Sequence, residues 1–246
     1  MSRLGRLRSE SRAASLAFLR RRTAVFFTFF FPLIIVVIFG VLVQTRPGGG
    51  GLFTEPPAYY APGYLAVVVL FTPLSRVGSE VARHRDGNRF EKLATTPLTR
   101  PEWLLAQTLV NVVIIGLAGI VLLGLMVALT GAQIRPSPLL VPFVVLGVAL
   151  FCGVGAMLGS LADSQDGVIS ASNGIAIPLL FLSETFVPPS LLPGWLPTWL
   201  SPLTYFSRGV RAATTGTGDS LLPLAVLTAC AVVGFLVGAR LLPRTD

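Results

Sequence analysis

Long uncharged apolar stretches constrain this chain more than any other feature of its sequence. A bilayer core about 30 Å thick needs roughly 20 apolar residues in one helix. Hydrophobic residues make up 53% of the chain and charged residues only 12%, a composition that excludes a soluble enzyme and a disordered chain. The sequence therefore predicts an all-α membrane protein. The charge-free stretches cover residues 23–45, 56–75, 103–134, 136–162, 167–183, 185–207 and 220–239.

The sixth stretch differs from the others because it contains five prolines. Each proline removes a backbone donor and clashes with the preceding helical turn, so residues 185–207 cannot form a straight spanning helix. We expect short broken helices at the membrane interface, with Trp195, Trp199 and Tyr205 as an aromatic belt. Six transmembrane helices remain, at about 23–43, 59–78, 104–130, 139–161, 168–184 and 220–240.

The distribution of basic residues predicts the orientation of these spans. All but four of the 19 lysines and arginines lie before the first span, between residues 76 and 100, or after the last span. Positive charge collects on the cytoplasmic side of membranes, so both termini are expected in the cytoplasm. In an apolar chain the net charge of +8 is explained by this asymmetry, and no nucleic-acid partner is expected.

Residues 1–22 are rich in arginine and serine, as a targeting peptide would be. However, the apolar run that follows has the length of a span, and no small-residue cleavage site follows it. A helix would place Leu4, Leu7, Ala14 and Phe18 on one face with arginines around it. We therefore predict an interfacial helix that lies along the membrane lipids.

Candidate catalytic residues are scarce. No ionisable residue lies in the middle of a predicted span, and no P-loop motif for ATP is present. His84 is expected to be solvated, and Asp163 and Asp166 to form a polar turn. Cys152 and Cys230 lie inside apolar runs and suggest no metal site. The chain is predicted not to be an enzyme and to hold no cofactor of its own. We attribute the GxxxG spacings at Gly155/Gly159 and Gly234/Gly238 to chance.

The most charged part of the chain, residues 79–102, also carries Phe90, Leu93 and Leu98. Gly87 and Asn88 break this segment, which predicts a short helix from about Arg89 to Ala94. An amphipathic helix here could dock on a soluble partner or rest on lipid, and the residues alone leave both interpretations open.

Two motifs resemble those of ABC-2-type transporter permeases. The run "RDGNRFEKLATTPLTRPEW" is similar to the family's segment between the second and third spans. The run "ETFVPPSLLPGWLPTWLSPLTYFSRGVRA" is similar to its segment between the fifth and sixth spans. The resemblance implies a single transmembrane domain over residues 1–246, with a cytoplasmic coupling segment at 79–102 and an outward-side re-entrant segment at 185–207.

The resemblance also implies a function. A permease of this type would sit in the plasma membrane of a prokaryote, pair with a second permease subunit and export cargo, while ATP is bound and hydrolysed by separate ATP-binding-cassette subunits. The coupling helix that docks on the ATPase would include Arg85, Asp86, Gly87, Glu91, Lys92 and Leu93. The outward-side gate would include Pro188, Trp195, Pro202, Tyr205 and Arg211.

Because the spans lack charge, we expect amphipathic or lipid-like cargo rather than a bare ion. Two other functions stay open on the residues alone. One is a structural or regulatory membrane subunit that binds a partner through residues 79–102 without transporting anything. The other is a membrane enzyme, which would need ionisable groups in the spans.

Overall fold

The computed structural model describes residues 2–38, 55–216 and 218–243, and within these ranges the secondary structure is entirely helical. Nine α-helices and three short 3₁₀-helices (η) fall in the described part. They are α1 (Arg3–Arg20), α2 (Arg22–Val36), η2 (Pro57–Tyr60), α3 (Ala61–Asp86), α4 (Arg89–Ala94), α5 (Arg100–Thr130), α6 (Leu140–Leu161), α7 (Gln165–Phe181), η3 (Pro189–Leu191), η4 (Thr198–Leu200), α8 (Pro202–Thr215) and α9 (Leu221–Leu241).

The longest helix, α5, shows how local sequence sets the helix ends. Thr99 accepts a hydrogen bond from the Glu102 backbone N–H, and the Glu102 side chain accepts one from the Thr99 N–H, which completes a capping box. Pro101 occupies the first turn, where its missing donor costs nothing. Gly131 ends the helix in the left-handed conformation, at φ 64°. With 31 residues, α5 is about 46 Å long.

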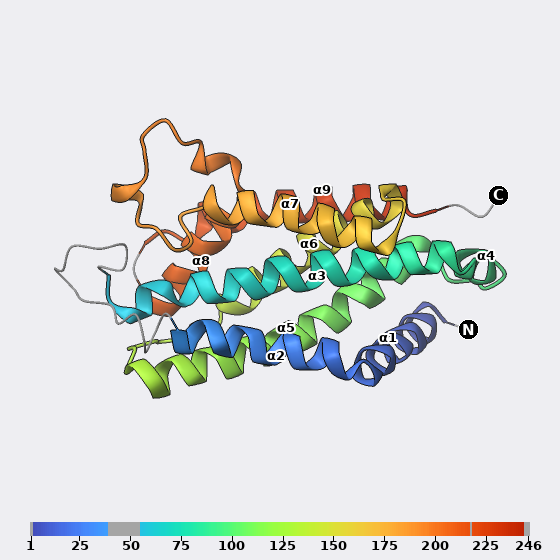
Figure 1. The fold of residues 1–246 in the computed structure, drawn as a ribbon, viewed down its shortest axis with the longest axis horizontal. Coiled ribbons are helices and arrows are strands. Elements are labelled where there is room, and N and C mark those ends of the chain that lie inside the picture. Colours follow the sequence, from blue (N-terminus) through green and yellow to red (C-terminus); the bar gives the residue numbers. More distant parts are fainter. Residues whose placement is uncertain (1, 39–54, 217, 244–246) are drawn as a thin grey trace.

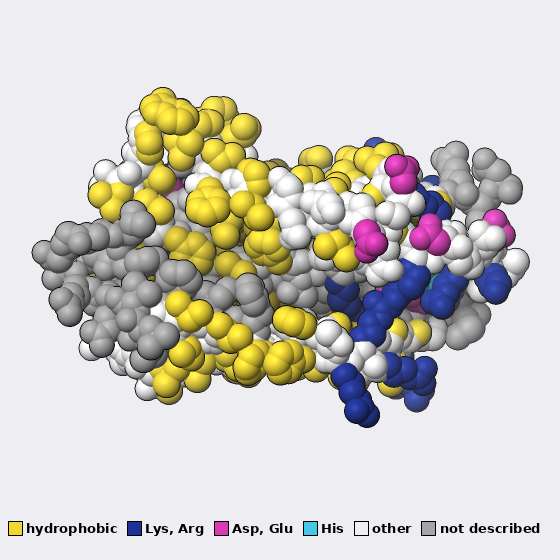
Figure 2. All heavy atoms as spheres, in the orientation of Figure 1, with side chains coloured by type: hydrophobic (Ala, Val, Ile, Leu, Met, Phe, Trp, Pro, Cys, Tyr) yellow, Lys and Arg dark blue, Asp and Glu magenta, His cyan; other side chains and the backbone are white. Residues whose placement is uncertain are grey.

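The helices form an elongated bundle in which α3 packs chiefly on α6, and α6 on α9 (Figure 1). The described chain begins and ends at the same end of this bundle. That end also carries α1 and α4, and lysines and arginines gather on its surface (Figure 2). We call it the basic end. The opposite end carries α8 and the connection formed by residues 182–201, and we call it the loop end.

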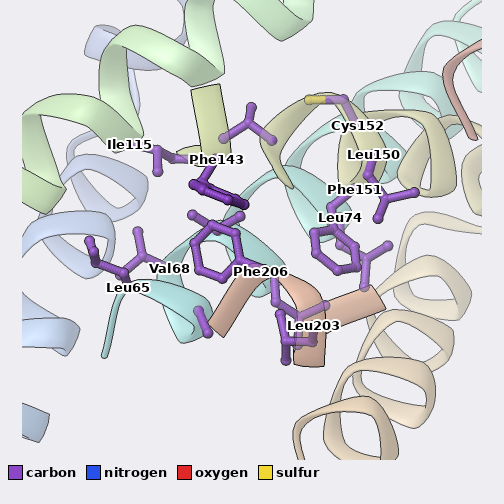
Figure 3. Close-up of a cluster of buried hydrophobic side chains, with 14 of the residues drawn as sticks. Leu65, Val68, Leu74, Ile115, Phe143, Leu150, Phe151, Cys152, Leu203 and Phe206 are labelled. Atoms are coloured by element: carbon purple, nitrogen blue, oxygen red, sulfur yellow. The ribbon is translucent and has the colours of Figure 1, made fainter. Parts of the chain in front are cut away.

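The core lies where α3, α5, α6 and α8 meet (Figure 3). Phe143 of α6 and Phe206 of α8 are fully buried, with Leu65 and Leu74 of α3 beside them. Glycines of α6 and α8 make room for these rings: a Cβ on Gly209 would overlap the Phe143 ring, and one on Gly147 would come within 3.0 Å of the Phe206 ring. Steric fit therefore positions α8 across the end of α6.

The GxxxG glycines lie at close helix crossings, so their attribution to chance was wrong. A Cβ on Gly155 would come within 2.6 Å of the Leu74 carbonyl oxygen of α3, and one on Gly159 would overlap the Gly78 carbonyl. Gly238 of α9 meets the backbone of Gly153 in the same way. Small residues let two helix backbones approach closely, and here they join α3, α6 and α9.

Four described helical segments are long and apolar enough to cross a membrane: Pro57–Asp86, Arg100–Thr130, Leu140–Leu161 and Leu221–Leu241. Their outward faces carry exposed apolar side chains such as Val113 of α5 and Val233 of α9. α7 corresponds to the predicted fifth span and has 17 residues. The predicted first span continues from α2 into residues 39–43, outside the described residues. That the chain crosses the membrane six times stays a prediction.

The predicted second span, 59–78, is longer than expected because α3 continues to Asp86. Arg76, which we placed in the following connection, therefore lies within this helix. Its guanidinium donates a 3.0 Å hydrogen bond to the Asn111 side chain of α5 and a 3.4 Å bond to the Ala14 carbonyl of α1, and it lies 5.0 Å from the centre of the Phe18 ring. Arg76 thus connects three helices, and its assignment to the connection between the spans was wrong.

The first helix is present as predicted, and half of its predicted apolar face packs on α5; contact of the rest with lipid stays a prediction. Ala14 and Phe18 are buried against Val110 and Ile114 of α5, whereas Leu4 is 79% exposed. Arg6 adds a salt bridge to Glu102 of α5, with 2.6 Å between Nη2 and Oε1. Contacts with α5 therefore determine the position of α1, because they bury half of the face that we had assigned to the membrane.

Candidate functional site

The predicted short helix after α3 is confirmed as α4, at the tip of the basic end (Figure 1). α3 ends at Asp86, and Gly87 caps it by donating its N–H to the Arg83 carbonyl. Asn88 follows with a φ of 50°, a left-handed conformation that asparagine tolerates. The chain reverses over these two residues, and α4 projects beyond the ends of the longer helices.

α4 is amphipathic. Arg89, Glu91 and Lys92 are exposed, whereas Phe90 and Leu93 are half-buried against the bundle. A helix of six residues is not stable alone, so the apolar side chains must hold it in place. The charged side chains are left free to meet a partner.

An aromatic cluster anchors α4 to the two longer helices. The ring of Phe90 lies 5.6 Å from Trp103 of α5 and 5.5 Å from His84 of α3, and the last two lie 5.6 Å apart. The His84 side chain is 12% exposed, and its Nδ1 lies 2.8 Å from the Glu80 carbonyl oxygen. His84 is therefore a packed residue, and the expectation that it is solvated was wrong.

A hollow of about 370 Å³ opens beside this cluster. Phe90, Leu93, Leu98 and Trp103 line it together with Pro243 from the C-terminal end. Its walls are largely apolar, while the neighbouring helix surface is charged. Interfaces between proteins typically combine an apolar centre with a polar rim, and this arrangement suits the docking of a protein.

The predicted docking residues fall into two groups. Glu91, Lys92 and Leu93 belong to α4 itself. Arg85, Asp86 and Gly87 precede it at the end of α3, and Arg85 points away from α4: its guanidinium donates a 2.5 Å hydrogen bond to the Ala162 carbonyl at the end of α6. Arg85 thus binds the free carbonyl of a neighbouring helix terminus.

The loop end contains an ion pair between a buried glutamate and a partly exposed arginine that sequence reasoning missed. Glu184, 4% exposed, follows the end of α7. Arg208 of α8 binds it through two hydrogen bonds, 2.8 Å from Nε to Oε2 and 2.5 Å from Nη2 to Oε1, and Thr198 donates a third at 3.2 Å. Burial alone would raise the pKa of Glu184, but the hydrogen bonds and charge of Arg208, with smaller effects of Thr198 and Arg211, lower it overall.

Arg211 links the same cluster to the start of α3. It donates a 3.1 Å hydrogen bond to the Glu184 carbonyl, and its guanidinium lies 4.0 Å from the centre of the Tyr59 ring in η2. The Thr185 and Ser207 hydroxyls form a further 2.9 Å hydrogen bond between the connection and α8. Three segments that are far apart in the sequence are therefore joined by polar contacts.

The predicted gate residues do not form one cluster. Pro188 is buried in the connection, and Trp195 is 80% exposed on it. Pro202 begins α8 and Tyr205 is half-buried along it, so the predicted segment 185–207 includes the first turns of a regular helix. Of these five residues, Arg211 is the one that contacts Glu184. The expected short broken helices are confirmed as η3 and η4.

Metal-binding side chains do not gather in the described part of the chain. No group of three His, Cys, Asp or Glu side chains that could hold a metal occurs there. Asp163 and Asp166 are exposed in the turn before and at the start of α7, where Ser164 caps the helix by accepting from the Gly167 N–H. Cys152 and Cys230 are free thiols.

Comparison with known proteins gives consistent matches. The family model described as "ABC-2 type transporter" matches residues 8–214. A daunorubicin resistance ABC transporter permease protein, DrrB1 of Streptomyces coeruleorubidus, is 26% identical over 166 residues, which cover 65% of this chain and 58% of the relative. A probable multidrug ABC transporter permease, YbhR of Escherichia coli K12, is 23% identical over 181 residues, which cover 70% of this chain and 49% of the relative. The chain thus spans about half the length of the curated relatives it matches.

Proposed function

Because this chain belongs to the ABC-2 type transporter family, we propose that it is the membrane permease subunit of an ATP-binding-cassette exporter. It is a multi-pass membrane protein, and its relatives are named as permeases. In this proposal the ATP is bound and hydrolysed by separate partner chains. The permease itself supplies the path across the membrane and the surface on which the ATPase acts.

α4 is the proposed docking site for the ATPase. The observation that carries this proposal is the way α4 is held: Phe90 packs between His84 and Trp103, while Glu91 and Lys92 remain exposed at the tip of the molecule. A push on α4 would be transmitted directly to α3 and α5, because aromatic contacts connect it to both helices. Movement of the ATPase could then shift these helices as rigid bodies.

The proposed orientation places the basic end in the cytoplasm of a prokaryotic cell. The concentration of arginine and lysine at that end supports this orientation (Figure 2), and an ATPase that uses cytoplasmic ATP must dock there. The loop end, with the Glu184–Arg208 pair, would then face outward and close the external end of the path.

A second permease subunit is proposed to cover α7. This helix exposes Ser170 and Asn173 beside Ile169 and Ile177. Polar side chains that face lipid are unfavourable, and they are usually placed against another helix or a cavity. A pair of subunits would bury this face and leave a path between them.

Amphipathic or lipid-like molecules are the proposed cargo. The names of the relatives point to drug transport, one to daunorubicin resistance and one to multidrug transport. The predicted spans carry almost no ionisable side chains, which supports cargo of this kind over a small ion.

Co-purification tests the proposal. The tagged chain is expressed with the ATP-binding-cassette protein of the same gene neighbourhood and isolated in mild detergent. We expect the ATPase in equal amount, and we expect Glu91→Ala to reduce it. Asp163→Ala is the matched control, because it removes an exposed carboxylate outside α4. If no ATPase accompanies the chain, the structural or regulatory subunit replaces the permease as the favoured function. Equal losses from both variants would argue against docking through α4.

A further inference from the structure

A groove of about 430 Å³ lies between α1, α2 and α5, apart from the docking segment and from the loop end. Phe18 and Leu19 form its wall on α1, and Phe29 its wall on α2. On α5 the wall includes Leu109, Val113 and Leu117, all exposed to the surroundings. The groove is therefore apolar and lies on the outer surface of the bundle.

The dimensions of this groove suit a lipid chain. Leu109 and Leu117 are eight residues apart on α5, which corresponds to about 12 Å along the helix. One leaflet of the hydrocarbon core is about 15 Å deep. The groove also runs along α5, as an acyl chain beside a spanning helix would. This follows because α1 lies beside α5 from Glu102, at the basic end, to Ile114.

Polar groups border the groove on α1. Ser11 and Ser15 line it, and the Ser11 hydroxyl is buried without a hydrogen-bond partner among the described residues. Arg8 precedes Ser11 by three positions and Arg12 precedes Ser15 by three, so both arginines lie close to this side of the helix. Both are exposed, and both line a second hollow of about 480 Å³ that is formed by α1 residues.

The charges of these arginines are not neutralised within the described residues. Arg6 pairs with Glu102, but Arg8 and Arg12 have no ion pair in the described part of the chain. Two guanidinium groups beside an apolar groove of this length match the chemistry of a lipid that carries a negative head group. The guanidinium fork binds phosphate oxygens in pairs.

We propose that this groove is a binding site for one anionic glycerophospholipid of the surrounding membrane, with its phosphate on Arg8 and Arg12 and one acyl chain between α1, α2 and α5. A second copy of the chain fits less well, because a two-fold contact on this face would bring the arginines of both copies together. The bound lipid would fill the angle between α1 and α2 and fix α1 against α5.

Lipid binding to the purified full chain in detergent tests this site. The probes are dioleoyl phosphatidylglycerol and dioleoyl phosphatidylcholine, measured by native mass spectrometry. We expect the wild-type chain to retain phosphatidylglycerol at least about tenfold more tightly, and Arg8→Gln/Arg12→Gln to remove that preference. Arg89→Gln/Lys92→Gln is the matched control, because it removes two exposed positive charges from the same end but from α4. It should keep the preference.

A second variant tests the acyl-chain groove. Val113→Trp places a large side chain in the groove and should weaken phosphatidylglycerol binding while the arginines remain. Inorganic phosphate at millimolar concentration should not compete with the lipid. Equal retention of both lipids by the wild-type chain, or an unchanged preference in the double arginine variant, would overturn the proposal. If Val113→Trp abolished a dimer and left lipid retention unchanged, the groove would belong to a second copy.

Discussion

Phe90 on α4 packs edge-on against Trp103 on α5, with 5.6 Å between the ring centres. This contact joins the exposed helix at the tip of the basic end to the longest helix of the bundle. In the proposed mechanism, force from the ATPase reaches the membrane path through it. Substitution of residues that hold α4 without facing a partner should therefore loosen this helix.

Phe90→Ala should loosen α4 while leaving the bundle folded. An aromatic pair contributes about 0.5–1.5 kcal/mol beyond the area it buries, and the substitution also loses that buried area, so local opening of α4 should become at least about fivefold more frequent. Trypsin cleavage after Arg89 and Lys92 measures this opening, and it should accelerate by a similar factor. Phe90→Leu, which keeps an apolar side chain, should behave more like the wild type. Unchanged cleavage in Phe90→Ala would show that the aromatic cluster does not anchor α4.

Glu184→Gln should destabilise the loop end. The variant loses the charged hydrogen bonds to Arg208, whose contribution we put at about 2 kcal/mol because Arg208 is partly exposed. Thermal unfolding in detergent, followed by tryptophan fluorescence, should show a lower midpoint. Asp163→Asn removes an exposed carboxylate and should have no effect. A charge reversal, Glu184→Arg with Arg208→Glu, should recover part of the loss, and failure of Glu184→Gln to lower the midpoint would exclude a stabilising pair.

The contribution of Glu184 should also depend on pH. Its pKa in the folded protein lies below the usual 4.5. The stabilisation is therefore complete above pH 4.5, and it is lost as the pH falls through the folded-state pKa. The difference in thermal midpoint between wild type and Glu184→Gln should stay constant from pH 8 to pH 5 and shrink below pH 4.5. A difference that shrinks near neutral pH would contradict a lowered pKa.

Gly153→Ala should disrupt the crossing of α6 and α9. The added Cβ would overlap the Gly234 backbone, so the helices must separate; overpacking of this kind costs about 1–3 kcal/mol. A Cβ on Gly116 of α5 meets no atom of the described chain within 4 Å. Gly116→Ala is therefore the matched control, and it should leave the thermal midpoint unchanged or raise it. Equal effects of the two substitutions would mean that the close crossing does not matter for stability.

Local sequence signals predicted the elements whose limits depend on nearby residues. Gly87 and Asn88 marked the turn before α4, and the helix from Arg89 to Ala94 was expected with those limits. The prolines of the 185–207 segment indicated broken helices because each proline disrupts the helical turn next to it. The apolar stretches predicted the long helices, because their length and apolar character are also properties of neighbouring residues.

Contacts between distant segments could not be predicted in this way. Glu184 looked like the end of a span, because its partner Arg208 lies 24 residues away and meets it only when α8 folds back. A single sequence could not distinguish the GxxxG spacings from chance, since their meaning depends on which backbone lies opposite. α3 was predicted too short because its last turns are charged. In the structure Arg83 and His84 both contact Glu80 along the helix.

Photocross-linking in intact membranes tests the docking of the ATPase on α4 most directly. A benzoylphenylalanine probe replaces Glu91 or Lys92 on α4, and separate chains carry it at Trp195 on the exposed connection of the loop end. We expect the ATP-binding-cassette subunit to be captured from positions 91 and 92 and not from position 195. Capture from position 195 alone, or from none of the three positions in cells that contain the ATPase, would contradict docking through α4.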